Sequence, residues 1–217
     1  QTISGNLRVT GELYSDTFRP DNINTTGIAT VGNLTVTSGY VNVSDSQRNT
    51  RVGENSGDSF DGTNPTDNTL IGYDAGTAIT TGDYNTAVGA QVLKANTTAS
   101  YSTAVGRQAL QANTTGSYNN AFGSGSLSLN TTGERNTAVG HNALTANTTA
   151  DHNTAVGYDS LKANTTGGNN TALGDSSLDA NTTGSNNTAL GIQALGANIT
   201  ASNNTAVGYQ ALLLNTT

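Results

Sequence analysis

The sequence has no cysteine and few apolar or aromatic residues. Hydrophobic residues make up 33% of the 217 residues and aromatic residues 5%, which is too little for the thick core of an ordinary globular domain. Without cysteine the chain forms no disulfide and no cysteine-based zinc site, although this absence leaves the redox compartment undecided. We therefore expect a thin core that is held together without covalent cross-links between cysteines.

Long apolar runs and basic clusters are also missing. No stretch approaches the roughly 20 apolar residues that span a bilayer, and residues 1–10 lack a charged-then-apolar secretory pattern. Eight Lys and Arg stand against 15 Asp and Glu, so the net charge of -7 repels nucleic acid and anionic lipid. The sequence predicts a soluble chain with no nucleic-acid partner and no membrane insertion, whose export signal, if any, lies outside it.

What the sequence does contain is a repeat of 17 residues that runs from Asn68 to the last residue. One unit reads N-T-A-V-G-x-x-A-L-x-A-N-T-T-G-S-x, and its places are numbered one to seventeen so that the recurring glycine stands at place five. That glycine appears as Gly72, Gly89, Gly106, Gly123, Gly140, Gly157, Gly174, Gly191 and Gly208. A fixed period indicates units that stack and bury a continuous core together, so we predict an all-β parallel β-roll, or β-solenoid.

Three segments are distinguished along the chain. Residues 1–48 contain the motif G-N-L-x-V-T twice, at residues 5–10 and 32–37, which predicts a short strand-rich connector. Residues 49–67 form a divergent first coil, since residues 49–53 copy the first five places and two extra residues follow in an acidic run. We expect that insertion to project as a loop, and residues 68–217 to form the regular roll.

Two short strands per coil are predicted, at places two to four and at places eight to eleven. A helix is disfavoured because glycine and the Asn-Thr-Thr-Gly turn interrupt every unit before a helix of about 11 residues could form. We expect two columns of large apolar residues to be the core, one at place four and one at place nine. They are Ile71, Val88, Val105, Phe122, Val139, Val156, Leu173, Leu190 and Val207, and Leu93, Leu110, Leu127, Leu144, Leu161, Leu178, Leu195 and Leu212.

Asparagine at place twelve, and mostly at place one, predicts ladders of stacked amides. Asn side chains bond locally to the backbone, tolerate left-handed conformations and bond to an equivalent Asn above and below. Asn-Thr-Thr also matches the acceptor pattern for N-glycosylation, but a ladder residue in every coil leaves no room for a bulky glycan.

Catalytic and metal-binding chemistry finds little support. The two histidines, His141 and His152, stand at variable turn places without a repeated nucleophile or carboxylate nearby, so we expect no enzyme activity and no cofactor. Asp58, Asp61 and Asp67 are a weak calcium candidate, because their spacing matches neither an EF-hand nor the nonapeptide calcium repeat. A solvated acidic loop without metal is the favoured interpretation.

Three tyrosines share place seventeen in consecutive coils: Tyr84, Tyr101 and Tyr118. Coils about 4.8 Å apart would stack these rings along one edge, either as a ladder that packs the turn or as a strip that receives a sugar ring. The adjacent Thr at places thirteen and fourteen suggest an ice-binding surface as an alternative. Neighbouring side chains in an extended strand point to opposite faces, which argues against a flat array of two Thr columns.

The motif N-T-A-V-G followed by A-L-x-A-N-T-T-G resembles the head repeats of trimeric autotransporter adhesins and, more closely, the β repeats of bacteriophage tail fibres. Residues 5–10 and 32–37 are similar to shaft units of such fibres. The resemblance implies an elongated homotrimer in a virion or at a cell surface, with other virion or fibre proteins at its ends. A host-surface glycan or protein would be its target.

The predicted function is therefore structural, as a segment of a phage tail fibre or spike that mediates or supports attachment to a host. A bacterial surface adhesin or extracellular filament subunit is the alternative, and an ice-binding solenoid is the minor one. Independently of the resemblance, the thin core argues for a partner surface, because burial of a few small side chains does not offset the entropy of ordering a coil.

Overall fold

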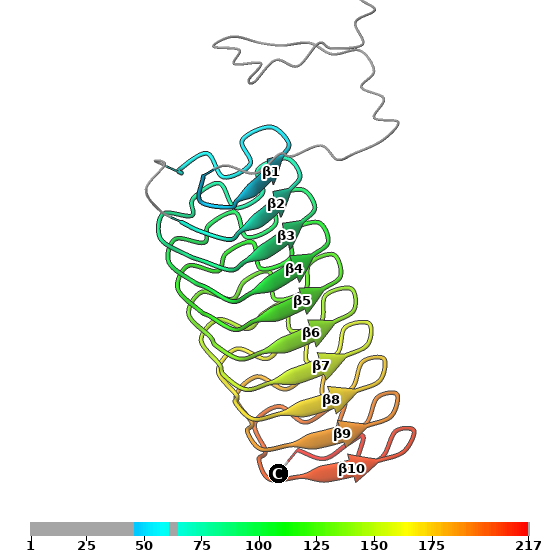
Figure 1. The fold of residues 1–217 in the computed structure, drawn as a ribbon. Coiled ribbons are helices and arrows are strands. Elements are labelled where there is room, and N and C mark those ends of the chain that lie inside the picture. Colours follow the sequence, from blue (N-terminus) through cyan, green and yellow to red (C-terminus); the bar gives the residue numbers. More distant parts are fainter. Residues whose placement is uncertain (1–45, 61–64, 217) are drawn as a thin grey trace, which may run out of the picture. The chain divides into compact units, whose positions relative to one another are not determined.

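The computed structural model describes residues 46–60 and 65–216, which form a solenoid with ten parallel strands in one sheet (Figure 1). The strands pair in chain order, and each occupies places two to four of its coil, as predicted. They are β1 (Thr50–Val52), β2 (Thr69–Ile71), β3 (Thr86–Val88), β4 (Thr103–Val105), β5 (Asn120–Phe122), β6 (Thr137–Val139), β7 (Thr154–Val156), β8 (Thr171–Leu173), β9 (Thr188–Leu190) and β10 (Thr205–Val207).

The register of the sheet confirms the repeat. Thr137 of β6 pairs with Thr154 of β7, and the same offset of one unit holds from β2 to β10. Thr50 of β1 pairs instead with Thr69 of β2, which is the longer first coil predicted from the sequence. The part of the chain that the structure describes contains no helix that is long and apolar enough to cross a membrane. The predicted connector lies outside the described residues, except for its last three.

The prediction of a second strand, at places eight to eleven of each coil, is wrong. The segment that follows the glycine at place five is a run of turns, in which places seven and nine both have left-handed backbone. In the coil of β4, Gln108 has φ 61° and Leu110 has φ 51°. Two left-handed residues separated by one residue bend the chain too sharply for an extended strand. The coils nevertheless stay hydrogen-bonded there, since the Leu110 N–H donates to the Ser126 carbonyl at 3.0 Å.

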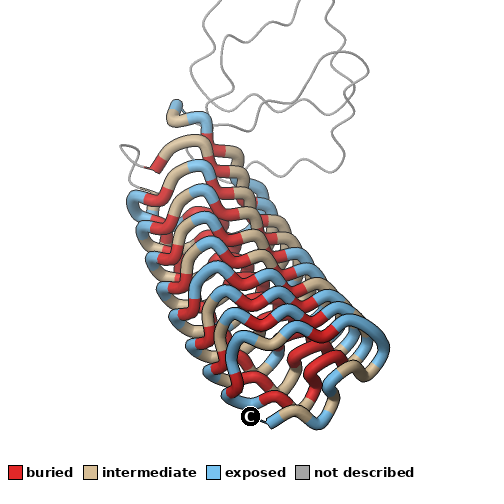
Figure 2. The backbone as a smooth tube through the Cα atoms, turned by 90° about the horizontal axis from the view of Figure 1, so that it is seen from below, coloured by how far each residue is buried: buried red, intermediate tan, exposed pale blue. Residues whose placement is uncertain are grey.

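The predicted core is half right. The leucines at place nine are buried, from Leu93 to Leu195, but the side chains of the place-four column point outward. Ala138 at place three of β6 is fully buried, whereas its neighbour Val139 is 38% exposed. Side chains alternate along a strand, so only one of these two columns can face inward. Figure 2 shows the buried positions recurring at equivalent places of successive coils. In the coils of β3 to β9 the core therefore consists of Ala at place three, Ala, Ser or Val at place eight and Leu at place nine, whereas the coil of β2 fills it with Leu70 and Ile79.

Both asparagine columns form the predicted ladders. At place twelve, the buried Asn147 amide donates to Asn130 Oδ1 at 2.8 Å and to the Ala150 carbonyl at 3.0 Å, and its own oxygen accepts from Asn164 Nδ2 at 3.1 Å. At place one, the backbone N–H of Asn153 donates to Asn136 Oδ1 at 2.9 Å. A buried amide nitrogen that donates two hydrogen bonds offers no free acceptor site for a glycan in the folded chain.

Candidate interaction surfaces

The outer face of the ten-stranded sheet carries a column of exposed and half-exposed apolar side chains that repeats in every coil. Place two contributes a column of Thr with Asn120, and place four contributes a column of Val, Leu, Ile and Phe. In this second column Val52, Ile71, Phe122, Val139, Leu173, Leu190 and Val207 are all exposed. No strand from β2 to β10 contains a charged residue. An apolar column of this length with no charge is typical of a surface that contacts another molecule.

Backbone geometry keeps this face regular. Each strand ends at the glycine of place five, where φ is 138° for Gly140 and 139° for Gly157. The Gly157 N–H donates to the Val139 carbonyl at 2.8 Å, so each strand end is fixed to the previous one. With about 4.8 Å between parallel strands, the ten strands extend over roughly 43 Å. The face is thus a long, narrow, uncharged strip, named the sheet face below, and formed by places two and four of β1 to β10.

The predicted tyrosine column is present at the edge where each coil turns into its strand. The ring centroids of Tyr84 and Tyr101 are 5.0 Å apart and those of Tyr101 and Tyr118 5.1 Å, with interplanar angles of 10° and 3°. The Arg135 guanidinium lies over the Tyr118 ring at 5.4 Å and closes the stack. Because the ring faces cover one another, a sugar would meet ring edges and hydroxyl groups. Sugar binding to this strip stays a prediction.

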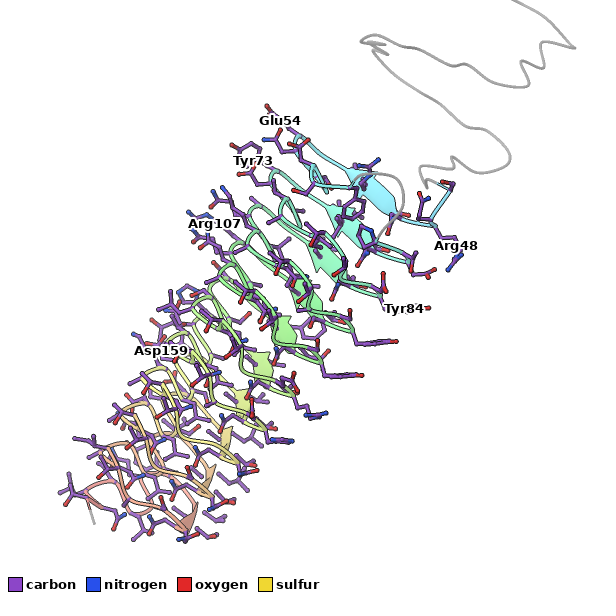
Figure 3. The ribbon with its side chains drawn as sticks, turned by 90° about the vertical axis from the view of Figure 1, so that its left-hand side faces the viewer. Arg48, Glu54, Tyr73, Tyr84, Arg107 and Asp159 are labelled. Carbon is purple, nitrogen blue, oxygen red and sulfur yellow. The ribbon has the colours of Figure 1, made fainter. Side chains whose placement is uncertain are left out.

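Place six forms the opposite edge of the coils. Figure 3 shows Glu54, Tyr73 and Arg107 succeeding one another along this edge, while Tyr84 and Arg48 project from the other. Residues at place six differ from coil to coil, and the pair His141 and Tyr158, with ring centroids 5.6 Å apart, is a tilted contact between neighbouring coils. The edge therefore lacks the uniform chemistry of the sheet face.

One carboxylate near this edge is well paired. The Asp74 side chain accepts from Lys94 Nζ at 2.8 Å and from Asn55 Nδ2 at 2.9 Å. These two hydrogen bonds, Lys94 first, hold the pKa of Asp74 below its ordinary value, and the same contact raises the pKa of Lys94. The arrangement ties the first three coils together, and it is consistent with a structural role for the carboxylate.

The remaining candidate residues are scattered. His141 at place six and His152 at place seventeen are exposed and stand on different edges. Of the calcium candidates, Asp61 lies outside the described residues and Asp58 is exposed. Asp67 accepts from Arg48 Nε at 2.6 Å, and this contact lowers the pKa of the carboxyl. Among residues 46–60 and 65–216 no group of three His, Asp or Glu side chains is placed to hold a metal ion.

The sheet face is the surface that the sequence prediction missed, because its apolar column was assigned to the core. The signal that could have found it is in the second coil, where place three is Leu70 and place nine is Gly76. In this coil the large residue stands at place three, whereas in the later coils it stands at place nine. This exchange indicates that the two places face the same interior.

No protein-family model, curated protein or solved structure matches the chain.

Proposed function

We propose that this chain is a structural segment of a phage tail fibre or spike, assembled as an elongated homotrimer, that supports attachment to a host surface. The observation that carries the proposal is the sheet face, a strip of exposed and half-exposed Val, Leu, Ile and Phe without charge along the described coils. Three copies packed through this face would remove the strip from water, and the burial of apolar area is the main favourable term in subunit association.

The thin core supports the same proposal. Each coil from β3 to β9 buries one Leu at place nine, Ala at place three and Ala, Ser or Val at place eight, with the rest of its interior taken mainly by Asn and by Gly or Ala. A coil that buries so little apolar area gains from a second apolar contact outside it. Burial of the place-four side chains between copies would supply that contact in every coil. The stability of the assembly would then increase with the number of coils.

The oligomer is tested by native mass spectrometry on the purified chain with two charge-introducing variants of one coil. Val139→Lys places a cation in the sheet face, whereas Thr149→Lys places the same cation at place fourteen, which is exposed on another side. We expect a mass of three chains for the wild type and for Thr149→Lys, and a single chain for Val139→Lys with an unchanged circular dichroism spectrum. A wild-type chain that stays monomeric at micromolar concentration contradicts the homotrimer.

The biological role is tested separately, by immunogold labelling with antibodies against this chain. Label along the tail fibres of purified phage particles supports the fibre. Label on the outer surface of bacterial cells, with none on particles, replaces it with the alternative, a surface adhesin or filament subunit. These two roles use the same rod and differ in what the ends attach to.

The sheet face also favours a second candidate, an ice-binding solenoid. The Thr side chains at place two and the aliphatic side chains at place four point to the same side and repeat at every coil. This array differs from the adjacent Thr pair at places thirteen and fourteen, of which place fourteen is exposed and place thirteen is half-buried in most coils. Thermal hysteresis of the purified chain, lost in Thr154→Tyr, is the expected result for ice binding. Its absence in the wild type removes this candidate.

A further inference from the structure

The described coils contain one site where phenol rings of consecutive coils meet, at Tyr84, Tyr101 and Tyr118. The rings are nearly parallel, with centroids 5.0 and 5.1 Å apart, and each is about half exposed. Tyr73, Tyr158 and Tyr209 stand at place six in coils that are not adjacent. The tyrosine ladder therefore combines closeness and access in a way that the other described tyrosines do not.

Hydrogen bonds of the backbone keep the three rings in this order. The Tyr101 N–H donates to the Asp83 carbonyl at 3.0 Å, and the Tyr118 N–H donates to the Ser100 carbonyl at 3.1 Å. All three residues have left-handed backbone, with φ of 57°, 58° and 61°. With the backbone held, rotation about the side-chain torsions is the movement by which the ring carbons next to the hydroxyl groups of neighbouring rings would approach one another.

We propose that the ladder is a site of oxidative cross-linking, in which Tyr101 couples with Tyr84 or with Tyr118 to give dityrosine. The oxidant is hydrogen peroxide used by a haem peroxidase. Each of the two phenols loses one electron and its hydroxyl proton, and the two radicals form a bond between the ring carbons next to the oxygens. Each ring then transfers the hydrogen of that carbon back to its oxygen. Two tyrosines and one peroxide yield one dityrosine and two waters.

The cross-link would join one coil covalently to the next. The chain has no cysteine, so disulfides cannot supply such a bond between coils. Closing a loop of 17 residues restricts the unfolded chain, as a disulfide does, and so favours the folded state. The inference does not depend on the proposed attachment function, because it needs only the stacked rings and an oxidant.

Trypsin makes the test direct. Lys94 separates Tyr84 from Tyr101 in the sequence, and Arg107 separates Tyr101 from Tyr118. The full chain is treated with horseradish peroxidase and hydrogen peroxide, unfolded, digested and analysed by mass spectrometry. We expect pairs of peptides joined at Tyr84 and Tyr101 or at Tyr101 and Tyr118, with the summed mass less two hydrogens. A mixture of isotopically labelled and unlabelled chains should give pairs that carry the same label.

Two variants decide the outcome. Tyr101→Phe keeps an aromatic ring in the ladder but removes the phenol that both neighbours need, so the joined peptides and the dityrosine fluorescence should fall to background. Tyr158→Phe removes one tyrosine outside the ladder and should leave the joined peptides unchanged. Absence of both joined pairs in the wild type, an equal yield in Tyr101→Phe, or pairs of mixed label would each overturn the proposal.

Discussion

The Leu70 side chain fills the space beside Gly76: a Cβ built on Gly76 would lie 2.9 Å from both methyl carbons of Leu70. In the coils that follow, place three is Ala and place nine is Leu, so the large residue has changed position while the interior stays filled. Close packing of this kind makes the two places interdependent. In the second coil the space beside place nine is thus filled by Leu70 from place three, together with Ile79 from place twelve.

A double-mutant cycle tests this exchange. Leu70→Ala leaves a cavity and should cost about 3 kcal/mol, and Gly76→Leu alone should overpack the same space and cost about 1–3 kcal/mol. The double variant has Ala at place three and Leu at place nine, as the later coils do, while Ile79, whose Cδ1 lies 2.8 Å from the same built Cβ, still borders the space. We expect it to be at least about 1 kcal/mol more stable than the sum of the single effects. Urea unfolding measures all three, and additive costs would show that the two places do not share one space.

Leu144 combines a buried side chain with left-handed backbone at φ 54°, which is unfavourable for any residue with a Cβ. Leu144→Ala and Leu144→Gly both lose the buried side chain and should cost about 2–4 kcal/mol. Gly releases the backbone strain, so we expect Leu144→Gly to be more stable than Leu144→Ala by up to about 1 kcal/mol. Gly76 at the same place, with φ 58°, is the natural precedent. An Ala variant that equals or exceeds the Gly variant in urea midpoint contradicts this.

The sequence was sufficient to predict the period, the parallel sheet, the glycine column, the asparagine ladders and the tyrosine stack. These features depend on places that repeat in register, so the stacking of equal residues follows from the period alone. The orientation of places three and four did not follow, because both are apolar and alternation does not say which faces inward. The turn at places eight to eleven was missed because its left-handed place nine is Leu in most coils and Gly only in the first two, as Gly57 and Gly76.

Gly140 approaches the next coil so closely that a Cβ on it would lie 2.3 Å from the Gly157 carbonyl oxygen. Its φ of 138° adds backbone strain for any other residue. Gly140→Ala should therefore cost about 3 kcal/mol or more, as the sum of strain and overpacking. Gly168→Ser is the matched control, since Ser stands at this place in several other coils, and it should change stability by less than about 0.5 kcal/mol. Equal urea midpoints for the two variants would contradict the close approach.

Asp74 makes stability depend on pH. Its pKa is held below the ordinary value of 3.8 in the folded chain, so on acidification the unfolded chain takes up the proton first. The stabilisation is present above pH 3.8 and is lost as the pH falls from there through the folded-state pKa. Asp74→Asn should reduce the urea midpoint near neutral pH, and the difference from wild type should narrow below pH 4. Lys94→Met, which keeps the carboxylate and removes the first cause of its lowered pKa, should show a weaker dependence.

Asn147 tests whether the ladder needs the amide or only its shape. Asn147→Asp keeps the outline, but a carboxylate cannot donate to Asn130 or to the Ala150 carbonyl, and it places a charge in a buried site. We expect a cost of about 3 kcal/mol near neutral pH. Burial raises the pKa of such a carboxyl, so the folded chain takes up the proton first and the loss should shrink as the pH falls. Asn169→Asp makes the same change at the exposed place seventeen and should have little effect. A similar small effect at Asn147 would show that the ladder contributes through packing alone.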